Sequence, residues 1–343
     1  MRDMASFIEQ MPKAELHMHI EGVLEPELKF EMAARNGIEL PYDSVDDPAA
    51  MYDFDDLPTF LDARYEGDTV LITEADFYDL GMAYYSTVAR ENLVYAEIFF
   101  DPQAHTTRGV EFSTVIEGLH RAQVDAESRL GIESHLIMCF LRDHSAESAH
   151  QALEQAAPYR DRIIGVGLDS DEQGNPPSKF ADVFAAAAAE GFRLTMHCDV
   201  DQENSVNHIW QAIDDIGVER IDHGVNALEE RALIGEFVNR RIGQTVCPIS
   251  NRYVVADSRS RDIKQMLDEG MLPTVNSDDP AYFRGYMNDN LAVAQSDGGL
   301  TAAEVGQLMR NAFTMSWTTD TRKQAYLAAL DEYLAASAGL DPD

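Results

Sequence analysis

The sequence predicts a parallel (β/α)8 barrel, an architecture in which each strand is followed by a helix and the strands close into a cylinder. Two observations favour it. Short apolar runs rich in β-branched and aromatic residues alternate with longer helical runs rich in Ala, Leu and acidic residues. The conspicuous polar residues of the short runs lie at their carboxyl ends, as expected for buried strands that carry a site at one end of the barrel. Since 45% of the 343 residues are hydrophobic, we expect residues 1–343 to form one domain.

Eight short runs are the expected strands. In chain order they are AELHMHI (14–20), LVYAEIFF (93–100), ESHLIMCFL (133–141), IIGVGLD (163–169), RLTMHCDV (193–200), RIDHGV (220–225), GQTVCPIS (243–250) and LPTVNSDD (272–279). Helices are expected between them, for example over FADVFAAAAAEG (180–191), SVNHIWQAIDDIG (205–217), ALIGEFVNRR (232–241) and RDIKQMLDEG (261–270). The region from about residue 24 to 91 has no clear strand pattern and looks helical. We expect it to be a helical insertion after the first strand, with the role of a lid.

Composition excludes several classes of partner. The formal charge of −35, from 61 acidic against 26 basic residues, repels phosphate backbones and anionic membranes, so we expect neither a nucleic acid nor a lipid partner. The three cysteines have no C-x-x-C spacing, which argues against disulfides and zinc fingers and favours a reducing cytoplasm. No secretion signal or membrane span is recognisable, so a soluble cytoplasmic protein is expected. The oligomeric state stays open, a homo-oligomer included.

A set of metal ligands is distributed over three of the expected strands. His17 and His19 are two residues apart, so their side chains point to the same side of a strand and can share one ion. His197 and Asp278 lie near the ends of two later strands, at the barrel face where active sites form. Three histidines and one carboxylate leave a position for water on Zn²⁺, although Fe²⁺ or Mn²⁺ would accept the same ligands.

Two further strand-end residues favour catalytic or binding roles. His223 closes its strand, and we expect it to hydrogen-bond the metal-bound water, orienting it and helping to remove its proton. Asp279 follows Asp278 and points in a different direction, so it could accept a hydrogen bond from a substrate. A helix or turn cap before Pro280 is the structural alternative for Asp279.

Five ordered motifs carry a resemblance to a known family: PKAELHMHIEG, GVGLDSDE, ERIDHGV, TVCPISN and VNSDDPAYF. They resemble the adenosine and adenine deaminases of the amidohydrolase superfamily, over about residues 10 to 330. FFDPQAHTTRGV, PPSKF and NSDDPAYFRGY are closer to the adenine deaminase branch. The resemblance implies a zinc-dependent hydrolase that removes the amino group of a 6-aminopurine, with His17, His19, His197 and Asp278 on the metal and His223 assisting the hydroxide.

The resemblance also implies the contacts of the purine. Asp279 would meet it at N7, and the backbone around Gly167 would meet the ring near N3. Glu21 occupies the place where nucleoside-specific members carry an Asp that meets the ribose, and its longer side chain makes a free base the expected substrate. Cys247 has no second Cys nearby, which excludes the different zinc site of the H-x-E and P-C-x-x-C deaminases.

One motif departs from the family. The family has H-A-G-E after the fifth strand, with the Glu as proton donor to N1, whereas this chain has His197, Cys198, Asp199 and Val200, and its loop is two residues longer. Val therefore stands at the Glu position. Asp199 and Asp201 are both candidate donors, because their parity with His197 directs them toward the barrel axis, and Glu203 is a third.

The altered loop lies close to the expected path of the leaving amine. We therefore hypothesise that it admits N6-substituted adenines, including cytokinin-like bases, as well as adenine. Two alternatives remain: a deaminase of adenosine or of another aminated heterocycle such as a pterin, and a catalytically silent paralogue that keeps the metal and binds a purine.

Overall fold

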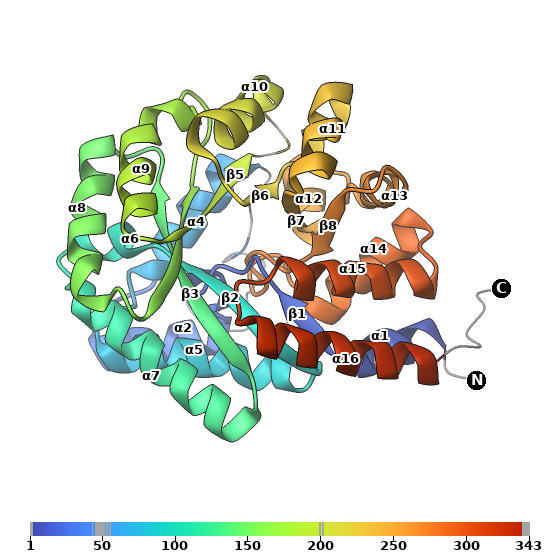
Figure 1. Cartoon of the computed structure of the whole chain (residues 1–343). Coiled ribbons are helices and arrows are strands. Elements are labelled where there is room, and N and C mark those ends of the chain that lie inside the picture. The colour runs from blue at the N-terminus through green and yellow to red at the C-terminus, as the bar shows by residue number, and fades with distance from the viewer. Residues whose placement is uncertain are drawn as a thin grey trace.

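The computed structural model describes residues 3–42, 44, 52, 54, 56–198, 200 and 202–337, and it contains an eight-stranded parallel barrel (Figure 1). The strands are hydrogen-bonded in chain order from β1 to β8. Their bounds are β1 Lys13–Glu15, β2 Leu93–Phe100, β3 Glu133–Leu141, β4 Ile163–Asp169, β5 Arg193–Cys198, β6 Arg220–His223, β7 Gly243–Val246 and β8 Leu272–Val275. The predicted fold class is confirmed.

The predicted strands agree with the observed ones most closely where both faces are apolar. β2, β3 and β4 have the predicted bounds, whereas β7 and β8 end earlier than predicted. β7 ends because Pro248 starts a helix, a position at which the missing N–H of proline costs nothing. β1 is short as well, and His17 and His19 lie just beyond it in an extended segment.

That extended segment closes the barrel at the carboxyl ends of the strands. Met18 pairs with Asp278 and His19 pairs with Phe99 in isolated parallel bridges. The His19 amide donates to the carbonyl of Asp278 at 2.9 Å, and the Asp278 amide donates to the carbonyl of His17 at 3.2 Å. The residues that close the barrel are thus the predicted metal ligands themselves.

Helices surround the barrel. In chain order they are α1 Met4–Gln10, α2 Pro26–Asn36, α4 Leu57–Asp68, α5 Glu74–Ala89, α6 Pro102–Thr106, α7 Phe112–Leu130, α8 Ala146–Ala156, α9 Ala181–Ala189, α10 Ser205–Trp210, α11 Arg231–Arg240, α12 Pro248–Val255, α13 Ser260–Asp268, α14 Met287–Gly298, α15 Ala302–Met315 and α16 Asp320–Ala336. The four helices named from the sequence are present, and the one predicted over 205–217 consists of α10 continued by a π-helical segment, Gln211–Ile216.

The region between β1 and β2 is helical, as expected, with α2, α4 and α5. Part of it lies outside the described residues, and its role as a lid stays a prediction. Within the described ranges, none of the helices is both long enough and apolar enough to span a membrane. For function, the important helix of this region is α4, because its side chains form one wall of the pocket described below.

Candidate metal and substrate site

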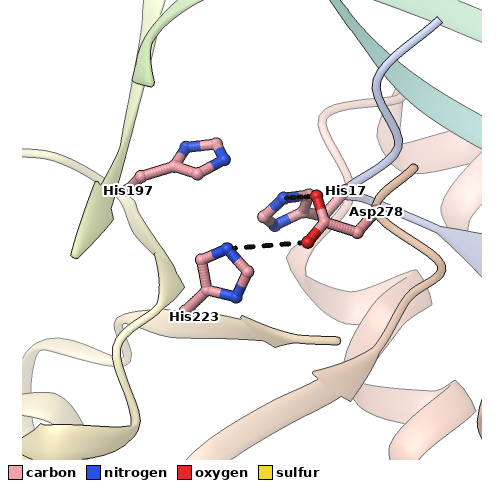
Figure 2. Close-up of side chains that lie close together, drawn as sticks. All are labelled: His17, His197, His223 and Asp278. Carbon is pink, nitrogen blue, oxygen red and sulfur yellow. Dashed lines mark ion pairs between the residues drawn. The ribbon is translucent and has the colours of Figure 1, made fainter. Parts of the chain in front are cut away.

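The predicted metal ligands converge at the carboxyl ends of the strands. Ligating atoms of His17, His197, His223 and Asp278 all lie within 4.8 Å of one another (Figure 2). His17 Nε2 lies 3.2 Å from Asp278 Oδ1, and His19 Nε2 lies 3.5 Å from the same oxygen. His19 Nε2 and His197 Nε2 are 3.1 Å apart. His223 Nε2 is 3.8 Å from the other carboxylate oxygen of Asp278, so it borders the same group.

The backbone at this face adopts conformations that non-glycine residues seldom take. His223 has a φ of 58°, Asp278 one of 65° and Ser170 one of 72°. Each such conformation costs on the order of 1–3 kcal/mol and persists only where the surrounding structure enforces it. His223 ends β6, Ser170 follows β4, Asp278 lies beyond the end of β8, and all three line one pocket. Three of the eight non-glycine residues with positive φ in the described chain therefore lie at the candidate site.

The outer nitrogens of the ligand histidines face acceptors. His17 Nδ1 donates to Thr245 Oγ1 at 2.8 Å, since that hydroxyl donates in turn to Asp222 Oδ1 at 2.9 Å. His197 Nδ1 lies 3.5 Å from Asp222 Oδ2. His19 Nδ1 lies 3.4 Å from Asp169 Oδ2. Such partners on the far side of a histidine fix its ring and direct the lone pair of the other nitrogen toward a metal.

Unpaired atoms within the cluster support a cation site. His17 Nε2 is buried and makes no hydrogen bond, and because Nδ1 carries the proton, the lone pair of Nε2 faces the carboxylate oxygen of Asp278. Two acceptors that face each other in a buried site need a proton or a metal ion between them. The donor set of imidazole nitrogens and one carboxylate therefore fits a divalent metal ion.

Electrostatics keep the ligands in the forms that bind metal. Burial lowers the pKa of His19 well below its usual value, and it lowers the pKa of His223 to about 3, so both rings are neutral near pH 7. Burial alone would raise the pKa of Asp278, but the neighbouring His17 and His223 outweigh it and hold that pKa well below the usual range. Neutral imidazoles and an ionised carboxylate are what metal binding requires.

A pocket opens beside this cluster. Its lining combines apolar walls with a few convergent polar groups. The apolar residues are Leu57, Phe60, Leu61, Val200, Val254 and Phe283, and the polar ones are His19, Arg64, Asp169, Ser170, His197, His223, Ser250, Asn251, Asp278 and Asp279.

Asp279, the predicted substrate contact, lies in this pocket. It is buried, and its Oδ1 makes no hydrogen bond. Burial raises its pKa well above the usual value, and the charge of Asp278 adds to the effect. A Cβ at Gly22 would lie 2.3 Å from Asp279 Oδ1, so the glycine of the H-I-E-G motif is what allows this carboxyl to sit where it does.

Gly167 and Glu21 do not line the pocket. Gly167 lies inside β4, where an added Cβ would meet Cys139 Sγ at 2.7 Å, and the lining comes instead from Asp169 and Ser170 farther along the same strand. Glu21 is fully buried and accepts hydrogen bonds from His105 Nε2 and from the Asp101 amide, both at 3.0 Å. Glu21 therefore lies behind the wall of the pocket and stabilises it.

The acids expected to replace the family Glu are only partly described. Asp199 and Asp201 lie outside the residues that the structure describes. Val200 lies between them, is 8% exposed and lines the pocket. Glu203 is exposed and borders a separate polar depression at the rim, beside His208.

Four residues of the site were not predicted from the sequence. Asp101 and Asp169 end the apolar runs of β2 and β4, so the strand-end pattern that identified the histidines also applied to them. Asp222 and Arg64 carried no such signal. Asp222 is an interior strand residue next to His223, and Arg64 is one charged side chain on an insertion helix.

Comparison with known proteins gives consistent results. The family described as adenosine deaminase matches residues 12–333. An adenine deaminase of Acinetobacter baylyi is 48% identical over 96% of this chain and 99% of its own. The crystal structure of an adenine deaminase from Arthrobacter aurescens matches with a TM-score of 0.91 and 41% identity, covering 95% of this chain and 99% of that one. An amidohydrolase from Burkholderia ambifaria, solved with bound Zn, matches with a TM-score of 0.89 and 25% identity over 99% and 96% of the two chains.

Proposed function

The chain belongs to the adenosine deaminase family, and from this premise we propose that it is a zinc-dependent hydrolase of a 6-aminopurine base, adenine or an N6-substituted adenine. The observation that carries the proposal is the convergence of His17, His19 and His197 with Asp278, beside a pocket whose polar groups include His223 and Asp279. The adenine deaminases of similar sequence and structure support a free base as substrate. The products would be hypoxanthine and ammonia or an alkylamine.

We assign the metal to His17, His19, His197 and Asp278, with Zn²⁺ as the ion. The zinc of the Burkholderia ambifaria amidohydrolase and the nitrogen-rich donor set support this choice. When bound, such an ion makes water acidic enough to supply hydroxide near neutral pH.

Hydrolysis joins the oxygen of water to C6 of the ring and breaks the bond from C6 to the exocyclic nitrogen. We assign His223 to orienting the attacking water and accepting its proton, because its neutral ring borders Asp278 and lines the pocket. Asp279 lines the pocket beside it and is assigned to the imidazole edge of the purine. Neither Gly167 nor Glu21 lines the pocket, so their contacts with the base stay predictions.

The proton that N1 needs must come from an acid other than the family Glu, because the side chain at that position is Val200. Asp199 and Asp201 flank Val200 in the chain and remain the candidates. Asp199→Asn and Asp201→Asn, compared in one assay, locate the donor. Loss of kcat in one variant identifies it, and wild-type rates in both exclude this assignment.

Val200, the apolar side chain at the position of the family Glu, also favours a larger leaving group on C6. Val200, Val254 and Leu57 line the same pocket and offer contact area that an ammonia leaving group does not need. Burying an alkyl substituent against them contributes ~0.8 kcal/mol for each CH₂ group. This supports N6-substituted adenines as substrates.

The test is a substrate panel with the purified, zinc-loaded enzyme. Amine release and ultraviolet change would be compared for adenine, N6-methyladenine, N6-isopentenyladenine, adenosine and a pterin that carries an amino group. Amine release from the purine bases supports the proposal, and a clear preference for plain adenine excludes the larger leaving group. Preference for adenosine assigns a nucleoside substrate, and preference for the pterin assigns a different ring. Silence on every compound with metal bound favours a purine-binding paralogue.

We propose the cytoplasm as the compartment. Cys139, Cys198 and Cys247 are all buried and form no disulfide, which suits a reducing environment.

A further inference from the structure

Arg64 forms part of the pocket wall and is held rigidly from behind. It lies on α4, is 3% exposed and lines the pocket. Its Nη2 donates to Glu21 Oε2 at 3.2 Å and to Asp101 Oδ2. Two carboxyls thus fix the far end of the guanidinium.

The near end of the guanidinium is unused. Arg64 Nε is buried and makes no hydrogen bond. Its neighbour in the pocket wall is Asp279 Oδ1 at 3.6 Å, which is too far for a hydrogen bond and is itself without a hydrogen-bond partner. A buried donor without an acceptor is costly, so this N–H gains most from a ligand that brings an acceptor to it.

The charges around Arg64 define what that ligand can be. Four carboxyl groups, those of Glu21, Asp68, Asp101 and Asp279, act on the guanidinium. Because the guanidinium is already in ion pairs with Glu21 and Asp101, little of its charge is left to attract a phosphate or carboxylate. A neutral acceptor is therefore favoured, and in a purine base the neutral acceptors are the ring nitrogens that carry neither hydrogen nor a substituent.

We propose that Arg64 is a specificity-determining residue whose Nε–H donates to an unsubstituted ring nitrogen of a neutral purine base, beside Asp279. Glu21 and Asp101 are positioning residues for this contact, which gives Glu21 a purpose other than touching the ligand. The contact favours neutral bases over phosphorylated purines. The identity of the ligand as a purine rests on the proposed function.

The test uses Arg64→Lys, because lysine keeps a cation for Glu21 and Asp101 while it removes the Nε donor. Its matched control is Arg35→Lys on α2, where a half-exposed Arg pairs with Asp79 at 2.8 Å. Binding of 6-methylpurine, which has no amine to lose, and of its 1-, 3-, 7- and 9-deaza analogues would be measured by calorimetry with the metal-loaded enzyme. Each analogue replaces one ring nitrogen by a C–H group.

Arg64→Lys should weaken binding of 6-methylpurine by roughly 10- to 100-fold, the loss of one charge-assisted hydrogen bond. The deaza analogue that lacks the contacted nitrogen should already bind weakly to the wild type. Arg64→Lys should weaken its binding little further. An equal effect of Arg64→Lys on every analogue, no effect on any, or no purine binding by the wild type overturns the contact. Normal thermal unfolding of the variant excludes misfolding. If binding depends on Arg64 but no 6-aminopurine releases its amine, the proposed deamination is refuted and the contact stands.

Discussion

The two ends of the barrel both bury charged groups, but they differ in how those groups are paired. Near the amino-terminal ends of the strands, Glu97 accepts from Tyr95 Oη at 2.6 Å and from the Trp317 amide at 2.5 Å. Its second oxygen lies 2.5 Å from Arg220 Nη1, and the Arg220 guanidinium lies 3.7 Å from the centre of a Trp317 ring. Glu97 is thus held by an ion pair and two hydrogen bonds, and the unpaired atoms here, Arg220 Nε and Nη2, belong to its charged partner.

At the carboxyl-terminal face, several buried atoms lack such partners. His17 Nε2, Arg64 Nε and Asp279 Oδ1 make no hydrogen bond. Left unpaired, each group costs about 1–3 kcal/mol or more. The difference is that the buried charges of Glu97 and Arg220 face each other, whereas the unpaired atoms at the other face belong to the predicted metal and substrate site.

The largest effect is expected at the metal cluster. Asp278→Asn removes the one charged ligand, so several kcal/mol of transition-state stabilisation are lost and kcat/KM should fall by about 10³-fold or more. Steady-state kinetics with metal analysis of the purified variant provide the measurement. A variant that keeps both its metal and its rate would show that Asp278 is not a ligand.

Near the amino-terminal ends of the strands, a substitution of a buried carboxylate should lower stability and leave activity unchanged. Glu97→Gln leaves the buried Arg220 without a counter-charge and should lower the free energy of unfolding by about 3–5 kcal/mol. The kcat of the folded protein at low temperature should stay unchanged. Glu219→Gln, which breaks an exposed pair with Arg193, is the control and should cost at most about 1 kcal/mol in urea unfolding. Equal losses in the two variants would contradict the pairing argument.

Removal of the metal should lower the free energy of unfolding through the loss of contacts at the carboxyl-terminal face. At a free metal concentration of 100 to 1,000 times Kd, metal binding contributes about 2.7–4.1 kcal/mol to the free energy of unfolding, and chelation should remove it. Thermal unfolding with and without zinc measures the difference. Asp278→Asn should show little zinc dependence, and a wild-type protein that unfolds at the same temperature in both conditions would argue against the site.

A smaller effect is expected where Gly22 makes room for Asp279. Gly22→Ala places a methyl group within 2.3 Å of Asp279 Oδ1, so the carboxyl must move. We expect a stability loss of about 1–3 kcal/mol from overpacking and a higher KM for the base. Gly235→Ala on α11 meets nothing within 4 Å and should be neutral or stabilising, which makes it the control. An unchanged KM in Gly22→Ala would mean that Asp279 does not touch the substrate.

The smallest expected effect is a pH-dependent one at Glu133, where β3 begins. Burial alone would raise its pKa, but hydrogen bonds from His135, Thr318 and Tyr326 outweigh burial and lower it to about 2. A carboxyl whose pKa is lower in the folded state stabilises above the unfolded value near 4.5, and that stability is lost as pH falls toward 2.

Glu133→Gln should therefore cost about 1–2 kcal/mol at pH 6, and the difference from wild type should shrink below pH 4.5. Urea unfolding of both proteins at pH 6, 5 and 4 measures it. A difference that does not change with pH would place the loss in packing rather than in the charge.

Much of the fold, and the strand-end residues that gather at the candidate site, could be predicted from the sequence. β2 to β4 were predicted with their observed bounds, because strands buried on both faces leave continuous apolar runs between polar turns. His17, His197 and Asp278 were found for the same reason, since a polar residue that ends such a run lies at the face where active sites form. Strand ends were less predictable where a proline or a left-handed residue stops the pairing, as at Pro248 and His223.

The sequence alone determined the barrel and the polar residues at its strand ends, because both follow from the alternation of apolar runs and turns along the chain. Only the tertiary structure decided that Glu21 points behind the pocket wall, that Asp222 serves both His17 and His197, and that Arg64 presents an unused donor beside Asp279. The physical reason is that pairing of buried charges depends on distances between elements far apart in the chain, and no local pattern records those distances.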